Sequence, residues 1–176
     1  ASLLSSQPLP KGNRVVIVSN AGGLGILCTD ACIGAGLDVS ALSADTQRRL
    51  QEVLPVEASV ANPVDMLGSA TAATYERAVP VVLSDETVDA VIVLFVPPVV
   101  ATASDVAEAL SRAVAAGERT TPVLGVIVGD HTVGPGEGYA RFDYPESAAR
   151  ALGRVVERRQ WLRRPAGTVP QLDDLR

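Results

Sequence analysis

Hydrophobic residues along the chain fall into short continuous runs. The strongest runs cover residues 15–18, 90–96 and 122–128 and consist mainly of Val, Ile and Leu. Runs without polar alternation are typical of strands buried on both faces of a parallel sheet. Weaker patterns predict two further short strands, at residues 37–42 and 139–143, the latter at an edge.

Apolar residues at helical spacing lie between these runs and predict helices. The predicted helices cover residues 26–35, 45–54, 71–83, 102–116 and 145–163. Strands and helices alternate, with no second core and no internal repeat. The sequence therefore predicts an α/β fold, a three-layer αβα sandwich with about five parallel strands.

The segment 56–71 is the longest one without clear periodicity, and it contains Asn62 and Asp65. Compact domains rarely keep long irregular loops without a use. The alternative is an ordinary connection with an Asx turn. Both interpretations stay open on spacing alone.

The two ends of the chain differ from its centre. Residues 1–12 contain Ser and Pro without a sustained period, which predicts a linker or an arm on the surface. Residues 165–176 are polar and predict a linker to a further domain. The domain itself is expected to cover residues 13–164.

Composition supports a core that needs neither disulfides nor metal. The 176 residues are 47% hydrophobic and 20% charged, and a chain of this size buries roughly 70% of its unfolded surface. No apolar run approaches the ~20 residues that span a membrane, and no signal peptide opens the sequence, so we expect a cytoplasmic protein. The net charge of −5 argues against nucleic acid as a partner.

Cys28 and Cys32 are the two cysteines and stand four apart on a predicted helix. A helix holds such side chains too far apart for relaxed disulfide geometry, and no further Cys or nearby His completes a zinc set. We therefore expect both to be buried core residues.

Two predicted strands lead directly to helix starts, and this pattern predicts an anion site. The first passes through a glycine-rich turn that includes Gly22 and Gly23, and a later one ends at Pro98, ahead of a capping pattern at Thr102 and Asp105. Helix starts offer free N–H groups and the positive end of the macrodipole. In a parallel sheet both starts lie at the carboxyl edge, where ligands bind.

Other motifs are weak or absent. The dinucleotide fingerprint lacks its third glycine, where Cys28 stands, and lacks an acidic residue after the second strand. A P-loop and a nucleophile elbow are missing. His131, beside Asp130 in a glycine-rich loop, is the only histidine. It is either a solvated loop residue or a candidate phosphoryl carrier or base.

Four segments together carry a resemblance to a known family. They are residues 13–23 (NRVVIVSNAGG), 61–71 (ANPVDMLGSAT), 89–98 (DAVIVLFVPP) and 144–165 (YPESAARALGRVVERRQWLRRP). In this order they resemble the nucleoside-diphosphate-forming acyl-CoA synthetases, relatives of succinyl-CoA synthetase that include acetyltransferase-fused forms. The resemblance covers residues 12–165 and falls on the flavodoxin-like CoA-ligase domain, equivalent to the carboxy-terminal domain of the succinyl-CoA synthetase β subunit.

The resemblance implies a function and a set of site residues. The family interconverts acid, CoA and nucleoside triphosphate with acyl-CoA, nucleoside diphosphate and phosphate through a phosphorylated histidine. The helix that starts near Thr102 would point its N-terminus at the phosphate. The residues implied at the phosphate site are Pro98, Thr102 and Ser104, with Gly22, Gly23, Asn62 and Asp65 beside them.

The resemblance also implies what lies elsewhere. The phosphohistidine belongs to a neighbouring domain, and His131 does not match it. The parent enzyme would use CoA, ATP or GTP, and Mg²⁺, with no metal site and no cofactor bound by this domain alone. Its partners would be CoA-binding, phosphohistidine-bearing and ATP-grasp domains, without which the isolated chain is expected to be inactive. The alternatives are a non-catalytic regulatory or docking module and a stand-alone nucleotide-binding protein.

Overall fold

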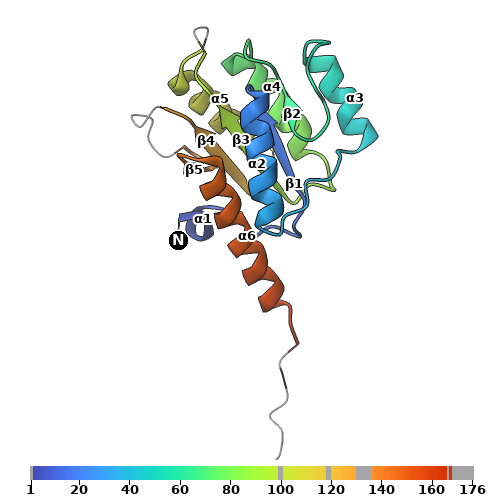
Figure 1. Ribbon diagram of the computed structural model, residues 1–176, viewed down its shortest axis with the longest axis vertical. Coiled ribbons are helices and arrows are strands. Elements are labelled where there is room, and N and C mark those ends of the chain that lie inside the picture. The colour runs from blue at the N-terminus through green and yellow to red at the C-terminus, as the bar shows by residue number, and fades with distance from the viewer. Residues whose placement is uncertain (1, 99–100, 118–119, 130–135, 166, 168–176) are drawn as a thin grey trace, which may run out of the picture.

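The computed structural model describes residues 2–98, 101–117, 120–129, 136–165 and 167. It contains a five-stranded sheet, all of whose strand pairs are parallel, with helices on both faces (Figure 1). The predicted α/β sandwich is confirmed.

The three strongest hydrophobic runs form the centre of the sheet. They are β1 (Val15–Ser19), β3 (Ala90–Phe95) and β4 (Val123–Ile127), and every residue in them is buried. The short strands β2 (Val64–Asp65) and β5 (Ala140–Phe142) lie at the edges. The resulting order, β2-β1-β3-β4-β5, is that of flavodoxin-like folds.

The predicted strand at 37–42 is wrong, and β2 takes its place beside β1. Only one bridge forms in that segment, between Arg14 and Asp38. Beyond the bridge the side chain of Asn62 occupies the edge of β1. Its Oδ1 accepts a hydrogen bond from the N–H of Ile17 at 3.0 Å, and its Nδ2 donates to the carbonyls of Val15 at 2.8 Å and Ser40 at 2.9 Å. A side-chain amide thus replaces the backbone pairing that a strand would supply.

The helices form two layers, close to the predicted segments. One layer holds α2 (Gly22–Gly34) and α6 (Pro145–Leu162), which pack together, with the short α1 (Ser2–Ser6) against α6. The other holds α4 (Ala72–Leu83) and α5 (Ala103–Ala115), with α3 (Ala44–Val53) packed against α4.

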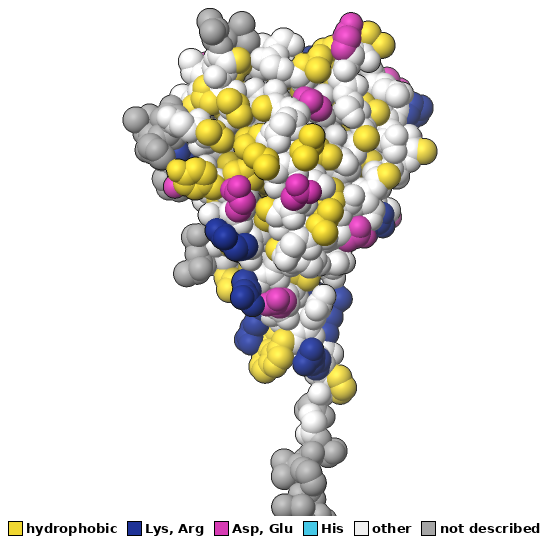
Figure 2. All heavy atoms as spheres, in the orientation of Figure 1, with side chains coloured by type: hydrophobic (Ala, Val, Ile, Leu, Met, Phe, Trp, Pro, Cys, Tyr) yellow, Lys and Arg dark blue, Asp and Glu magenta, His cyan; other side chains and the backbone are white. Residues whose placement is uncertain are grey.

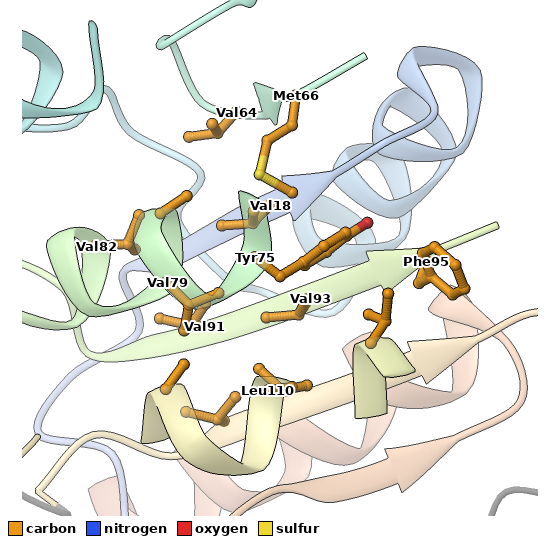
Figure 3. Close-up of a cluster of buried hydrophobic side chains, with 14 of the residues drawn as sticks. Val18, Val64, Met66, Tyr75, Val79, Val82, Val91, Val93, Phe95 and Leu110 are labelled. Carbon is orange, nitrogen blue, oxygen red and sulfur yellow. The ribbon is translucent and has the colours of Figure 1, made fainter. Parts of the chain in front are cut away.

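Each layer closes its own hydrophobic core. Under α4 and α5, the fully buried ring of Tyr75 meets Phe95 edge to face, with centroids 5.8 Å apart (Figure 3). The core between the sheet and the helices α2 and α6 includes Cys28 and Cys32 of α2. Both are buried and free, as predicted. A hydrogen bond that the protonated Cys28 thiol donates to Cys32, together with burial, raises the pKa of Cys28 far above its usual value, so this thiol stays protonated and unreactive.

Part of the predicted linker or arm of residues 1–12 packs against the rest of the chain. Leu3 of α1 is buried in the core under α6. The side chain of Gln7 donates to the carbonyl of Gly138 at 3.1 Å and accepts from the N–H of Val123 at 2.9 Å. One apolar side chain and one amide thus attach this segment to the rest of the chain, a pattern too short for periodicity to detect.

Asp85 is a buried carboxylate that joins the loop after α4 to the start of α3. It accepts hydrogen bonds from the N–H of Ser43 at 3.1 Å and from the N–H and hydroxyl of Thr87 at 3.0 and 2.7 Å. Burial alone would raise the pKa of Asp85, but hydrogen bonds from Thr46, Thr87 and Ser43 outweigh it and hold the pKa well below its ordinary range.

Replacing Asp85 with alanine is expected to lower the free energy of unfolding by about 2 kcal/mol near neutral pH, since the partly buried donors of Ser43 and Thr87 lose their acceptor. Because the folded pKa is depressed below the ordinary value of ~3.9, the contribution is complete above about pH 5 and is lost as the pH falls through the folded pKa. Urea unfolding at several pH values measures this, with Glu86→Ala, at an exposed neighbour, as control. A destabilisation that stays constant down to pH 2 would contradict the assignment.

Candidate functional site at the carboxyl edge of β1 and β3

The flavodoxin-like strand order reverses direction between β1 and β3, so their carboxyl ends form the switch point where such folds bind ligands. Both predicted helix starts lie here. The helix α2 follows β1 on one face of the sheet, and α5 follows β3 on the other (Figure 1).

The turn after β1 is fixed by the buried Ser19. Its hydroxyl accepts from the N–H of Ala21 at 3.0 Å and donates to the carbonyl of the same residue at 2.9 Å. The helix α2 then starts at Gly22, and no side chain caps it. An added Cβ there would lie 2.6 Å from Oδ2 of Asp65, so a larger residue would force this carboxylate to move.

Asp65 therefore lies against the start of α2. Its Oδ1 accepts from the N–H of Leu67 at 3.0 Å, and Leu67 itself has a φ of 68°. The carboxylate sits where the positive end of the α2 dipole favours a negative charge. An incoming phosphate would meet one carboxylate at either helix start, Asp65 at α2 and Asp105 at α5. What distinguishes α5 is that a side chain caps its first turn, whereas none caps α2.

The start of α5 is capped and open. The hydroxyl of Thr102 accepts from the N–H of Asp105 at 3.2 Å and donates to its Oδ2 at 2.7 Å, which confirms the predicted N-cap. Thr102 and Ser104 are exposed, and Pro98 is half-buried. Because the first N–H groups of a helix have no intrahelical partners, this turn offers donors to an anion.

Asn20 is a site residue to which the sequence analysis assigned no role. It is only 4% exposed. Its Nδ2 donates to the carbonyl of Val96 at 2.8 Å, and its Oδ1 accepts from the N–H of Val96 at 2.9 Å. This pair locks the turn after β1 to the turn after β3. The sequence feature that could have identified Asn20 is its position: a polar residue directly after a buried strand, at the edge of the sheet where ligands bind.

The structure brings most of the predicted site residues to one edge. Gly22, Gly23 and Asp65 lie at the start of α2 and the end of β2, and Pro98, Thr102 and Ser104 lie between β3 and the first turn of α5. Asn62 does not belong with them, since its side chain bonds the middle of β1. His131 lies outside the described residues.

Within the described ranges, no group of three or more His, Cys, Asp or Glu side chains could hold a metal ion. No helix in the described part of the chain is long and apolar enough to cross a membrane.

A five-stranded parallel sheet in this order, with helices on both faces, defines a flavodoxin-like α/β domain. More narrowly, the chain belongs to the Ligase-CoA domain family, whose model matches residues 15–157.

Relatives of this chain include ADP-forming ligases. It is 36% identical over 160 residues to the α subunit of acetate–CoA ligase (ADP-forming) II from Pyrococcus furiosus, which covers 86% of this chain and 35% of that subunit. It is 30% identical over 175 residues to 4-hydroxybutyrate–CoA ligase (ADP-forming) from Nitrosopumilus maritimus, covering 96% of this chain and 25% of that protein.

A solved structure of acetyl-coenzyme A synthetase 1 from Ca. Korarchaeum cryptofilum, in complex with phosphate and ADP, has the same fold. It superposes with a TM-score of 0.79 at 28% identity, over 89% of this chain and 36% of that one. The chain thus spans about a third or less of the length of these relatives.

Proposed function

We propose that this chain is the ligase domain of an ADP-forming acyl-CoA synthetase. The enzyme would convert a carboxylic acid, CoA and ATP into acyl-CoA, ADP and phosphate through a phosphorylated histidine. The observation that carries the proposal is the capped, exposed start of α5 at the switch point of a Ligase-CoA domain. Relatives named as ADP-forming ligases support it.

In this proposal the first turn of α5 holds the phosphoryl group. The N–H groups near Ser104, with the positive end of the helix dipole behind them, stabilise its negative charge. Thr102 fixes the turn through its bonds to Asp105. On the other side, Gly22 and Gly23 let the phosphohistidine segment approach the backbone closely.

The remaining chemistry is assigned to other domains. The two relatives are about 2.5 and 3.8 times as long as this chain, as the shares covered imply (86% against 35%, and 96% against 25%), which leaves room for CoA-binding, phosphohistidine-bearing and ATP-grasp domains as partners. ADP-forming relatives favour ATP over GTP. We assign the Mg²⁺ of the nucleotide site to those partners as well, together with the nucleotide phosphates that it accompanies.

The test uses the intact synthetase that contains this domain. It is expected to release ADP and acyl-CoA from ATP, CoA and acetate or 4-hydroxybutyrate, and crystals grown with phosphate are expected to hold the anion at the start of α5. A well-occupied phosphate elsewhere, with this turn empty, would count against the site. An enzyme that works equally well without this domain would favour a docking module. Saturable binding of NAD, FMN or ADP by the chain alone, in calorimetry, would favour a nucleotide-binding protein.

A further inference from the structure

The outward face of α2 lacks the polar character of a solvent-exposed helix. Ile26, Leu27 and Ile33 are 63%, 55% and 61% exposed. Exposed glycines flank them at both ends of the helix, and the one charged residue on this face is Asp30. We call these exposed residues of α2 the α2 face. Figure 2 shows hydrophobic side chains gathered over the part of the surface where α2 runs.

The opposite side of the same helix is also apolar. Cys28 and Cys32 are fully buried there, and Gly25 packs against Pro63. A helix that is hydrophobic all round is normally buried on all sides. The sequence of α2 therefore suits a helix with a protein neighbour on both faces, whereas this chain supplies only one.

The outward faces of other helices differ. On α3, Arg48 forms ion pairs with Asp45 and Glu52, and on α6, Arg154 pairs with Glu157. Such charged side chains are typical of a solvent-exposed helix face. Exposed large hydrophobic side chains also occur at the end of α6, at Trp161 and Leu162, but α2 carries three of them with one charged residue between.

We propose that the α2 face docks against an apolar surface of a neighbouring domain of the same synthetase. That surface would present large aliphatic or aromatic side chains, which fit beside the glycines, and a basic side chain opposite Asp30. About two thirds of each relative lies outside the region that this chain matches, so a covering domain is available. This inference rests on the proposed function.

The position of the face supports a neighbour within the enzyme. The face starts at Gly22 and Gly23, at the candidate phosphate site, and continues along α2 to Gly34. A domain seated on it would end at the carboxyl edge of β1. It would then exclude water from the site on the side that α5 does not cover.

The test is side-chain footprinting by hydroxyl radicals, without substrates. Ile26, Leu27 and Ile33 are expected to be labelled at least fivefold less in the intact synthetase than in this chain alone. Val56, which is 94% exposed in the loop after α3, is the internal reference and should be labelled equally in both. Equal labelling of the α2 face in the two samples would overturn the proposal.

A double variant, Ile26→Lys with Ile33→Lys, tests the contact in the synthetase. It should raise the rate of proteolytic separation of this domain about tenfold relative to Val56→Lys, while the melting temperature of the chain alone stays unchanged because the positions are exposed.

A concentration-dependent dimer of the chain that protects the same residues, with no protection in the synthetase, would assign the face to a second copy and overturn the proposal. An inactive synthetase with a protected face would count against the proposed function alone, whereas an active one with a fully labelled face would overturn only the docking proposal.

Discussion

A synthetase carrying Ser104→Glu is expected to lose about 99% of its kcat/KM. The added carboxylate would lie in the first turn of α5, beside the phosphoryl group. Repulsion between unit charges ~5 Å apart at an effective dielectric constant of ~20 is about 3 kcal/mol, which lowers the rate about 100-fold. Steady-state release of ADP and acyl-CoA measures the effect.

The same substitution separates activity from stability. A negative charge in the first turn interacts favourably with the helix dipole, so the variant should be as stable as the parent or more stable by about 0.5 kcal/mol. Ser104→Gln is the matched control, because Gln has nearly the same shape as Glu but no charge. This variant should keep most of the activity. If the Glu and Gln variants turned over equally, the start of α5 would not face the phosphoryl group.

The second large effect is expected at Asn20. Asn20→Leu keeps the branched shape of the side chain but leaves both the N–H and the carbonyl of Val96 without their partner, and each unsatisfied buried group costs about 1 to 3 kcal/mol. We expect the free energy of unfolding to fall by about 3 kcal/mol near pH 7. Urea denaturation provides the measurement.

Asn20→Asp distinguishes this hydrogen-bonded pair from simple packing. The ionised carboxylate can accept from the N–H of Val96 but repels its carbonyl, whereas the protonated form can donate to that carbonyl. Its folded pKa should therefore rise above the ordinary ~3.9. The folded state then binds the extra proton, so the stability of this variant relative to Asn20→Leu should increase as the pH falls from about 7 toward 4. A difference independent of pH would show that Asn20 does not bridge the two turns.

The sequence predicted the parts of the fold that repeat a physical pattern. Residues 90–96 are apolar on every side, and a strand buried on both faces is the simplest structure for them. The start of α5 was predictable because Thr102 and Asp105 form a local cap, whose partners are three residues apart. Periodicity and local hydrogen bonding are both encoded within one segment.

The missed features depend on partners far apart in the sequence. The two-residue β2 is too short for any period, and Asn62 replaces a strand through bonds to residues that stand 45 and 47 positions before it. Asn20 meets Val96 across 76 positions. In α2 apolar residues lie on all sides. The sequence predicted the burial of Cys28 and Cys32, but it gave no sign that Ile26, Leu27 and Ile33 stay exposed.

The interrupted pairing along the outer edge of β1 also bears on aggregation. The carbonyl of Asp38 accepts a hydrogen bond from the N–H of Val15, and the side chain of Asn62 bonds the carbonyl of Val15 and the N–H of Ile17. The carbonyl of Ser19 accepts from the N–H of Met66. No stretch of this β-branched strand is thereby left long enough to recruit a strand from another molecule, a common route to fibrils. The residues that form these hydrogen bonds with the outer edge of β1 follow it in the chain. In a nascent polypeptide the outer edge of β1 therefore stays open to intermolecular pairing until the segment through Met66 has been synthesised, and the inner edge until β3 follows.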